Sequence, residues 1–174
     1  RFELGLIRNH YVGRTFIEPS QNIRSLGVKL KLSSTKSMVK NKSIILIDDS
    51  LVRGTTCYKI VKMLYESGAK EVHVRIACPE IKFPDFYGVD MPTKKELLAH
   101  QKNNEEMCKY IKAKSLKFLS LHGLYVGLEK GTRNNSYPQF SDHYFTGDYP
   151  IKPEDNLGQT KITQLSLLSG KSNN

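Results

Sequence analysis

The stretch IILIDDSLVRGTT, over residues 44–56, decides the fold class. With Ser43 before it, its first half is a short continuous apolar run that ends at Asp48, a pattern typical of a strand buried on both faces. The second half turns through Gly54 into a helix that is expected to stop at Gly68. The apolar side of that helix carries Ile60, Val61, Met63 and Leu64. The sequence therefore predicts a strand, a turn and a helix in immediate succession.

The chain after this unit continues to alternate between strands and helices. Residues 71–78 alternate strictly, which predicts a strand with one face less buried than the other. Thr93 and Glu96 form a plausible capping box for a helix that carries Leu97 and Leu98. Further expected elements are a helix over 104–112, a strand over 115–119 and a short helix over 121–128. This order predicts an α/β fold with a parallel sheet.

Both ends of the sequence have a different character. Residues 3–7 read as a strand, and the polar stretch from 8 to 42 has weak periodicity and is long for a loop. Such loops are usually functional or mobile. Residues 161–174 have the composition of a frayed end.

Composition narrows the class of protein. The chain has 174 residues, 39% of them hydrophobic and 25% charged, which fits one domain with a real core. It carries no apolar run near the roughly 20 residues that a membrane span needs. Its first residues lack the apolar stretch and cleavage pattern of a secretory signal, so secretion is not expected. The three cysteines, Cys57, Cys78 and Cys108, have no C-x-x-C spacing, so neither a disulfide framework nor a zinc knuckle is expected. A reducing, cytoplasmic compartment is the simple interpretation.

The net charge of +10 has two interpretations. It would suit nucleic acid, or a small substrate rich in phosphate. The basic residues are scattered rather than gathered in one block, so most of them are interpreted as a solvated surface. Nucleic acid and membrane partners are accordingly not expected.

The chemistry concentrates in residues 48–56. Asp48 and Asp49 would lie at the carboxyl end of a sheet, where open α/β folds bind ligands. The turn and the helix start after them offer backbone N–H groups and two threonine hydroxyls, which together make a phosphate site. Two carboxylates beside a phosphate make sense if they accept hydrogen bonds from hydroxyls or help hold a magnesium ion. A sugar phosphate fits both requirements.

These residues resemble the phosphoribosyl pyrophosphate (PRPP) loop of the type I phosphoribosyltransferases. Residues 5–17, 78–92 and 145–150 are in turn similar to the amidophosphoribosyltransferase family, and the resemblance covers the chain from about residue 3 to 150. It implies a Rossmann-like parallel sheet with flanking helices, incomplete at its N-terminus. Residues 1–150 would be the C-terminal part of a phosphoribosyltransferase domain and residues 151–174 a tail, with no glutaminase domain.

The resemblance also implies roles for individual residues. PRPP would bind through the loop, with Asp48 and Asp49 at the ribose hydroxyls and at magnesium. The remaining PRPP-binding residues would be Ser50, Arg53, Gly54, Thr55 and Thr56. A mobile loop over residues 8–21 would close over PRPP and exclude water from a transition state that resembles an oxocarbenium ion. The catalytic residues expected there are Arg8, Tyr11, Arg14 and Thr15.

The same resemblance sets expectations for cofactors and partners. Magnesium is the expected cofactor, and no iron–sulfur cluster is expected, because Asp85, Ser141 and Tyr144 stand where cluster-binding members have cysteines. The full-length family implies a homo-oligomer. The hypothesis is that this chain alone binds ribose phosphates weakly, catalyses nothing, and needs a separately encoded N-terminal fragment that carries the glutaminase.

Two other functions remain open at this point. Some transcriptional regulators use the same PRPP loop without catalysis, and the net charge would suit DNA, although no helix-turn-helix is apparent. The third possibility is an inert gene remnant. Among single residues, Cys57 is expected to pack in the core. His73, His100, His122 and His143 are expected to be surface or hydrogen-bonded histidines without a metal role.

Overall fold

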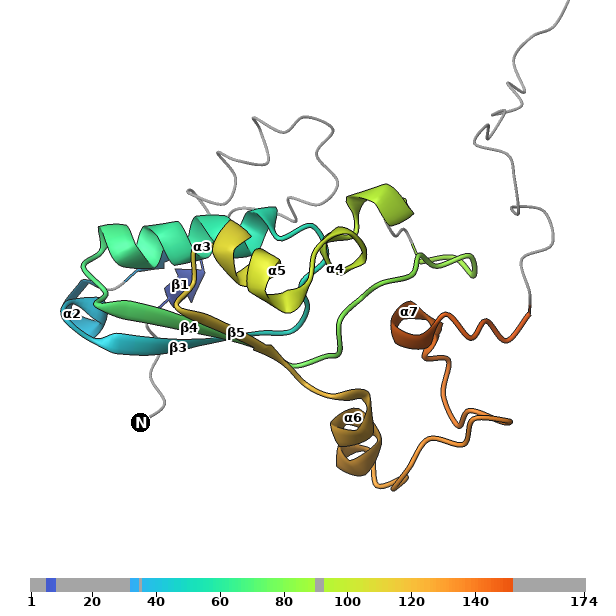
Figure 1. Cartoon of the computed structure of the whole chain (residues 1–174). Helices are drawn as coiled ribbons and strands as arrows, with labels where there is room; N and C mark the ends of the chain where they lie inside the picture. The colour runs from blue at the N-terminus through green and yellow to red at the C-terminus, as the bar shows by residue number, and fades with distance from the viewer. Residues whose placement is uncertain (1–5, 9–31, 35, 90–92, 152–174) are drawn as a thin grey trace, which may run out of the picture.

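The computed structural model of the chain describes residues 6–8, 32–34, 36–89 and 93–151 (Figure 1). Its strands are β1 (Leu6–Arg8), β2 (Leu32–Ser34), β3 (Ser43–Asp48), β4 (Glu71–Ile76) and β5 (Ser115–Phe118). Its helices are α2 (Lys36–Val39), α3 (Thr55–Glu66), the 3₁₀ turn η2 (Lys94–Glu96), α4 (Leu98–Gln101), α5 (Asn104–Tyr110), α6 (Leu121–Gly127) and α7 (His143–Thr146). Among these helices none is long and apolar enough to cross a membrane.

The centre of the fold is a parallel sheet in the order β3-β4-β5. Asp48 pairs with Ile76 in β4, and Ile76 pairs with Phe118 in β5, so the carboxyl ends of the strands meet at one edge. The connections run through α3 and through α4 and α5, and Figure 1 shows α3 and α5 on the same face of the sheet. The predicted α/β class and parallel sheet are confirmed.

The core lies between the sheet and these helices. Helix α3 contributes Cys57, Ile60, Val61 and Leu64. From β4, Val72, Val74 and Ile76 are buried, whereas His73 and Arg75 on the opposite face are only half-buried. The predicted alternation of β4 is therefore confirmed, and the buried face is the one that the helices cover.

Strand β3 differs from its prediction. Ile45 is 63% exposed and Ile47 is 65% exposed, so the expectation of a strand buried on both faces is wrong for the described part of the chain. The two residues stand in register with His73 and Arg75, on the face turned away from α3 and α5. Strand β3 is also an edge strand of this sheet. An apolar run therefore predicted the strand but not what covers it.

The N-terminal prediction also needs correction. Strands β1 and β2 pair antiparallel, with Arg8 opposite Leu32, so Arg8 belongs to a strand rather than to the expected loop. Residues 8–42 are not one structureless loop, because β2 and α2 lie within them. With three and four residues, these elements are too short to give a periodic signal. The expected catalytic residues Tyr11, Arg14 and Thr15 lie outside the described residues.

The other predicted elements are present with small changes at their ends. The capping box of Thr93 and Glu96 is formed, but it begins the single turn η2, and α4 follows after Leu97. A second box, from Asn103 and Glu106, begins α5. Strand β5 and helix α6 match their predictions to within about one residue. Helix α7 was not predicted.

Candidate functional site

The two carboxylates lie at the carboxyl edge of the sheet, as expected. Asp48 is the last residue of β3, and its backbone carbonyl accepts a hydrogen bond from the N–H of Ala77 (2.9 Å), which ties the strand end to the chain after β4. Oδ1 of Asp48 accepts from the N–H of Asp49 (3.1 Å), and Oδ1 of Asp49 accepts from the hydroxyl of Ser50 (3.0 Å). Each carboxylate therefore keeps a second oxygen that no described residue occupies.

The environment raises the pKa of Asp48 above its usual value. Burial is the main cause, the negative charge of Asp49 adds to it, and the hydrogen bond from the Asp49 N–H opposes both. A hydroxyl donor or a cation beside this carboxylate would offset the same cost. The ionised form of Asp48 would therefore gain from such a neighbour.

The turn after the carboxylates is held by contacts with the core and with α4 and α5. Leu51 is 2% exposed and belongs to the core, and the carbonyl of Val52 accepts from the N–H of Leu98 (2.9 Å). Gly54 has φ 74°, in the left-handed region that favours glycine. A Cβ at Gly54 would lie 2.6 Å from Cδ2 of Leu98 and 3.0 Å from Cε1 of Tyr110. Both the backbone angle and the lack of space require glycine here.

The start of α3 leaves donors unsatisfied. The carbonyl of Gly54 accepts from the N–H of Tyr58 (2.9 Å), which closes the first helical turn, but Gly54 has no side chain to cap the helix. The first N–H groups of a helix have no intrahelical partner. Among the described residues, none bonds the hydroxyls of Thr55 and Thr56. Backbone amides and two hydroxyls are thus available to an anion beside the positive end of the helix dipole.

Arg53 is held by a residue from a distant part of the chain. Its Nε donates to Oε1 of Glu96 (3.1 Å), and both side chains are partly exposed. The other carboxylate oxygen of Glu96 accepts from the N–H and the hydroxyl of Thr93. The loop is therefore joined to η2 through Glu96.

The predicted PRPP-binding residues thus lie on one continuous segment from the end of β3 to the start of α3. Gly54 is buried, and the others are at least partly exposed. The structure pairs Arg8 with Leu32 in the small β1–β2 sheet. A shallow pocket of about 380 Å³ opens where the chain leaves β4 and β5, at the same edge of the sheet. Its lining residues include Pro79, Lys82, Lys117 and Leu119.

The acidic pair suits magnesium only with additional oxygen ligands. In the described part of the chain, no group of three or more His, Cys, Asp or Glu side chains could hold a metal ion. Mg²⁺ commonly binds through one or two carboxylates, several waters and substrate phosphates. Asp48 and Asp49 fit that pattern and do not form a complete cage.

Two thiols lie close to the carboxylates, and sequence patterns did not place them there. Burial, with the negative charge of Asp48, raises the pKa of Cys57 to about 12. Burial and the charges of Asp49 and Asp48 raise the pKa of Cys78 to about 11, while a hydrogen bond from the N–H of Leu51 opposes them. Cys57 is 2% exposed, which confirms that it packs in the core.

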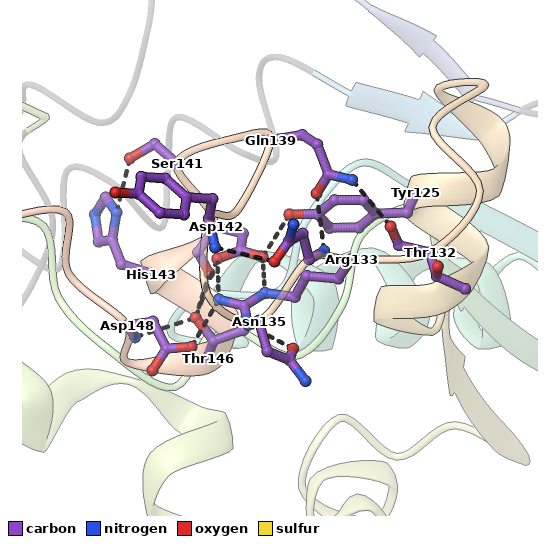
Figure 2. A network of polar contacts seen from close by, with 12 residues as sticks. Tyr125, Thr132, Arg133, Asn135, Gln139, Ser141, Asp142, His143, Thr146 and Asp148 are labelled. Carbon is purple, nitrogen blue, oxygen red and sulfur yellow. Dashed lines mark hydrogen bonds and ion pairs between the residues drawn. The ribbon is translucent and has the colours of Figure 1, made fainter.

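A second polar network was also missed by the sequence analysis (Figure 2). Arg133 donates to both carboxylate oxygens of the buried Asp142, at 2.6 and 3.1 Å, and to Asp148 at 2.6 Å. The hydroxyl of Tyr125, from α6, donates to Asp142 at 2.8 Å. Hydrogen bonds from Arg133 and Tyr125 and the charge of Arg133 outweigh burial and lower the pKa of Asp142. The network fastens the segment after α6 to the start of α7.

The positions at which the resemblance places cysteines gather around His143. Its Nε2 contacts Oδ1 of Asp85 at 2.8 Å, and its Nδ1 contacts the hydroxyl of Ser141 at 3.1 Å. Tyr144 also bonds Asp85, and its carbonyl accepts from the N–H of Lys82. His143 is 1% exposed, which confirms the interpretation of a hydrogen-bonded histidine. The expectation that these positions hold no iron–sulfur cluster stays a prediction.

Comparison with known proteins gives close relatives. The chain is 56% identical over 169 residues to the amidophosphoribosyltransferase of Rhizobium etli, which covers 97% of the chain and 34% of that relative. It is 52% identical over 151 residues to the amidophosphoribosyltransferase of Staphylococcus aureus, which covers 86% and 30%. A chloroplastic amidophosphoribosyltransferase of Arabidopsis thaliana is 51% identical over 154 residues, which covers 88% and 26%. No family model matches the chain.

Solved structures of related enzymes are also similar to the chain. Glutamine PRPP amidotransferase from Bacillus subtilis, complexed with ADP and GMP, has a TM-score of 0.71 and 48% identity, over 85% of this chain and 32% of that one. A structure described as the allosteric regulatory enzyme of purine biosynthesis has a TM-score of 0.69 and 47% identity, over 86% and 32%. The chain spans between about a quarter and a third of the length of the proteins it matches.

The comparisons confirm the resemblance noted in the sequence, and they give no support to a transcriptional regulator. They leave the compartment open, because the plant relatives are named chloroplastic. The cytoplasmic assignment therefore stays a prediction.

Proposed function

Because the chain belongs to the amidophosphoribosyltransferase family, we propose that residues 48–56 bind the ribose 5-phosphate part of PRPP for the first committed step of purine synthesis. In that reaction ammonia attacks C1 of the ribose as pyrophosphate leaves, and 5-phosphoribosylamine forms. The observation that carries the proposal is that two carboxylates, unsatisfied helix amides and two hydroxyls follow one another along a single segment at the carboxyl edge of the sheet.

Each part of the loop has a role in this proposal. Asp48 and Asp49 accept hydrogen bonds from the ribose hydroxyls with their unoccupied oxygens, and the diol replaces the solvent that burial removes from Asp48. The amides at the start of α3 and the threonine hydroxyls hold the 5-phosphate. Ser50 orients Asp49 through its hydrogen bond, and the guanidinium of Arg53 adds positive charge beside the phosphate.

Magnesium would be held by the same two carboxylates together with oxygens of the substrate, and it would neutralise charge on the pyrophosphate. Residues 9–21 would close over PRPP, with Tyr11 and Thr15 excluding water. Arg14 from this loop, and Arg8 from the end of strand β1 before it, would lie near the departing pyrophosphate. Closure matters because water would intercept the cationic ribose before ammonia does.

Catalysis is proposed to require more polypeptide than this chain. Edge strand β3 exposes Ile45 and Ile47 on a face that no described helix covers. Exposed strand edges and apolar faces are liabilities in an isolated domain. The relatives are about three times longer, so their remaining length can supply this cover, the pyrophosphate loop and the glutaminase that releases ammonia. That part would come from the same polypeptide or from a separately encoded fragment, and the complete assembly would be a homo-oligomer.

Calorimetric titration of the chain with PRPP and Mg²⁺, together with an assay of ammonia-dependent phosphoribosylamine formation, tests this proposal. We expect weak binding and no turnover. Asp48→Asn and Asp49→Asn should weaken binding, and Glu66→Ala, on the exposed end of α3, should not. Absence of binding by the wild-type chain contradicts the site, and robust turnover contradicts the requirement for further polypeptide.

A further inference from the structure

The ion pair between Arg53 and Glu96 bridges 43 positions of sequence at the centre of the loop. Glu96 uses its two oxygens differently: Oε1 accepts from Nε of Arg53, and Oε2 accepts from the N–H and the hydroxyl of Thr93. The bonds from Thr93 therefore hold the carboxylate of Glu96 at η2 independently of its contact with Arg53. The N–H of Leu98 also donates to the carbonyl of Val52, so a backbone hydrogen bond joins the loop to the start of α4, directly after η2.

This contact engages only one of the guanidinium nitrogens. The side chain of Arg53 is 36% exposed, and within the described residues neither of its terminal nitrogens has a partner. A guanidinium presents its donors in a rigid fork. A contact at Nε that fixes the plane of the group thus leaves the pair of terminal nitrogens available for two oxygens of a phosphate.

We propose that Glu96 is a positioning residue, which orients the guanidinium of Arg53 so that its terminal nitrogens bind the 5-phosphate of the ligand. This inference rests on the proposed function of residues 48–56, and it assigns to η2 a role in affinity for the phosphorylated end of the substrate. Glu96 itself does not touch the ligand, because its acceptors are already engaged by Arg53 and Thr93.

Stability alone gives little reason for this pair. Exposed ion pairs contribute little to folding, since solvent screens the charges and two long side chains must be ordered. Lys62 and Glu66 form a comparable exposed pair on α3, at 3.7 Å. That pair lies at the far end of the helix from the loop and provides a matched control.

A double-mutant cycle with ribose 5-phosphate as the probe tests the inference. Binding is measured for the wild-type chain and for Arg53→Ala, Glu96→Ala, the double variant and the control Glu66→Ala. Loss of one charge-assisted hydrogen-bonding group should weaken binding about tenfold in each of the first two variants. Because Glu96 acts through Arg53, the double variant should bind no more weakly than Arg53→Ala, and the control should bind like the wild type.

Two conservative variants separate orientation from simple folding support. In Glu96→Gln the amide oxygen still accepts from Nε, and the amide NH₂ can donate to the hydroxyl of Thr93, although the bond from the Thr93 N–H is lost. Because the contact with Nε is kept, affinity should return to within about twofold of wild type. Arg53→Lys keeps the charge but has no fork, so it should bind as weakly as Arg53→Ala. If Glu96→Ala fails to fold, binding by Arg53→Lys as tight as that of the wild type would still overturn the inference, because it would show that the fork is not needed.

The inference is overturned if Glu96→Ala binds like the wild type. It is also overturned if the double variant binds ribose 5-phosphate about a hundredfold more weakly than the wild type, because two independent tenfold effects would give that result. A third contradicting result is binding by Glu96→Gln as weak as that of Glu96→Ala. These outcomes leave the proposed function intact because the wild type still binds. A wild-type chain without affinity for ribose 5-phosphate overturns both.

Discussion

Substitution of Gly54 by alanine tests the geometry of the candidate loop at its tightest point. Gly54 has φ 74°, and an L-residue in the left-handed region costs roughly 1–2 kcal/mol. The added Cβ would lie 2.6 Å from Cδ2 of Leu98 and 3.0 Å from Cε1 of Tyr110, and such overpacking typically costs about 1–3 kcal/mol. We expect Gly54→Ala to lower the free energy of unfolding by about 2–5 kcal/mol.

Gly131→Ala provides the matched control. Gly131 has φ 66°, close to that of Gly54, but no atom lies within 4 Å of its added Cβ. Its substitution should cost only the backbone term, about 1–2 kcal/mol. The difference between the two variants therefore isolates the contacts with Leu98 and Tyr110.

Urea denaturation followed by circular dichroism measures both variants. The midpoint should fall further for Gly54→Ala than for Gly131→Ala, with the same dependence of the free energy on urea concentration. Gly54→Ala should also lose affinity for ribose 5-phosphate, whereas Gly131→Ala should keep it. Equal destabilisation of the two variants would refute the argument that α4 and α5 pack closely against the loop.

Three further predictions concern titration, the buried network and the thiols. Burial raises the pKa of Asp85, but hydrogen bonds from Val89, His143 and others outweigh it and lower the value to about 2. A pKa difference of one between the folded and unfolded chain corresponds to about 1.4 kcal/mol, so the lowered pKa of Asp85 contributes about 2 kcal/mol to stability. This contribution should be present above pH 4 and be lost as the pH falls towards 2. In acid titrations of the unfolding free energy, Asp85→Asn should remove that part of the decline, and an unchanged acid profile would contradict this account. Arg133→Ala leaves the charge of Asp142 buried, so it should cost about 3 kcal/mol by urea denaturation, and a loss below about 1 kcal/mol would contradict the network. Because burial raises its pKa to about 12, Cys57 should stay unlabelled by a thiol reagent at pH 8 in the native chain and react after denaturation, as peptide mass spectrometry can establish.

Local patterns predicted the elements on which the site depends. The apolar run to Asp48, the turn at Gly54 and the amphipathic helix after it are all encoded within about 25 residues, and the alternation over residues 71–78 placed the buried face of β4 correctly. The residue pattern already indicated a sugar-phosphate site, and the resemblance to phosphoribosyltransferases specified PRPP as the ligand.

Long-range contacts could not be predicted in the same way. The pair of Arg53 with Glu96 and the bridge from Arg133 to Asp142 and Asp148 join residues whose spacing follows no helical or strand period. The exposure of Ile45 was missed because an apolar run records a preference for burial and not the presence of a covering element. Strand β2 and helix α2 were missed because three or four residues cannot display a period.

The most direct test of the account is an NMR titration of the ¹⁵N-labelled chain with PRPP and Mg²⁺. The account predicts that the largest changes in amide chemical shift fall on residues 48–56, and that they are strongest at Gly54, Thr55 and Thr56, whose amides would meet the phosphate. Changes that are confined to other parts of the chain, or no change at millimolar PRPP, would contradict the claim that this loop receives a phosphorylated ribose.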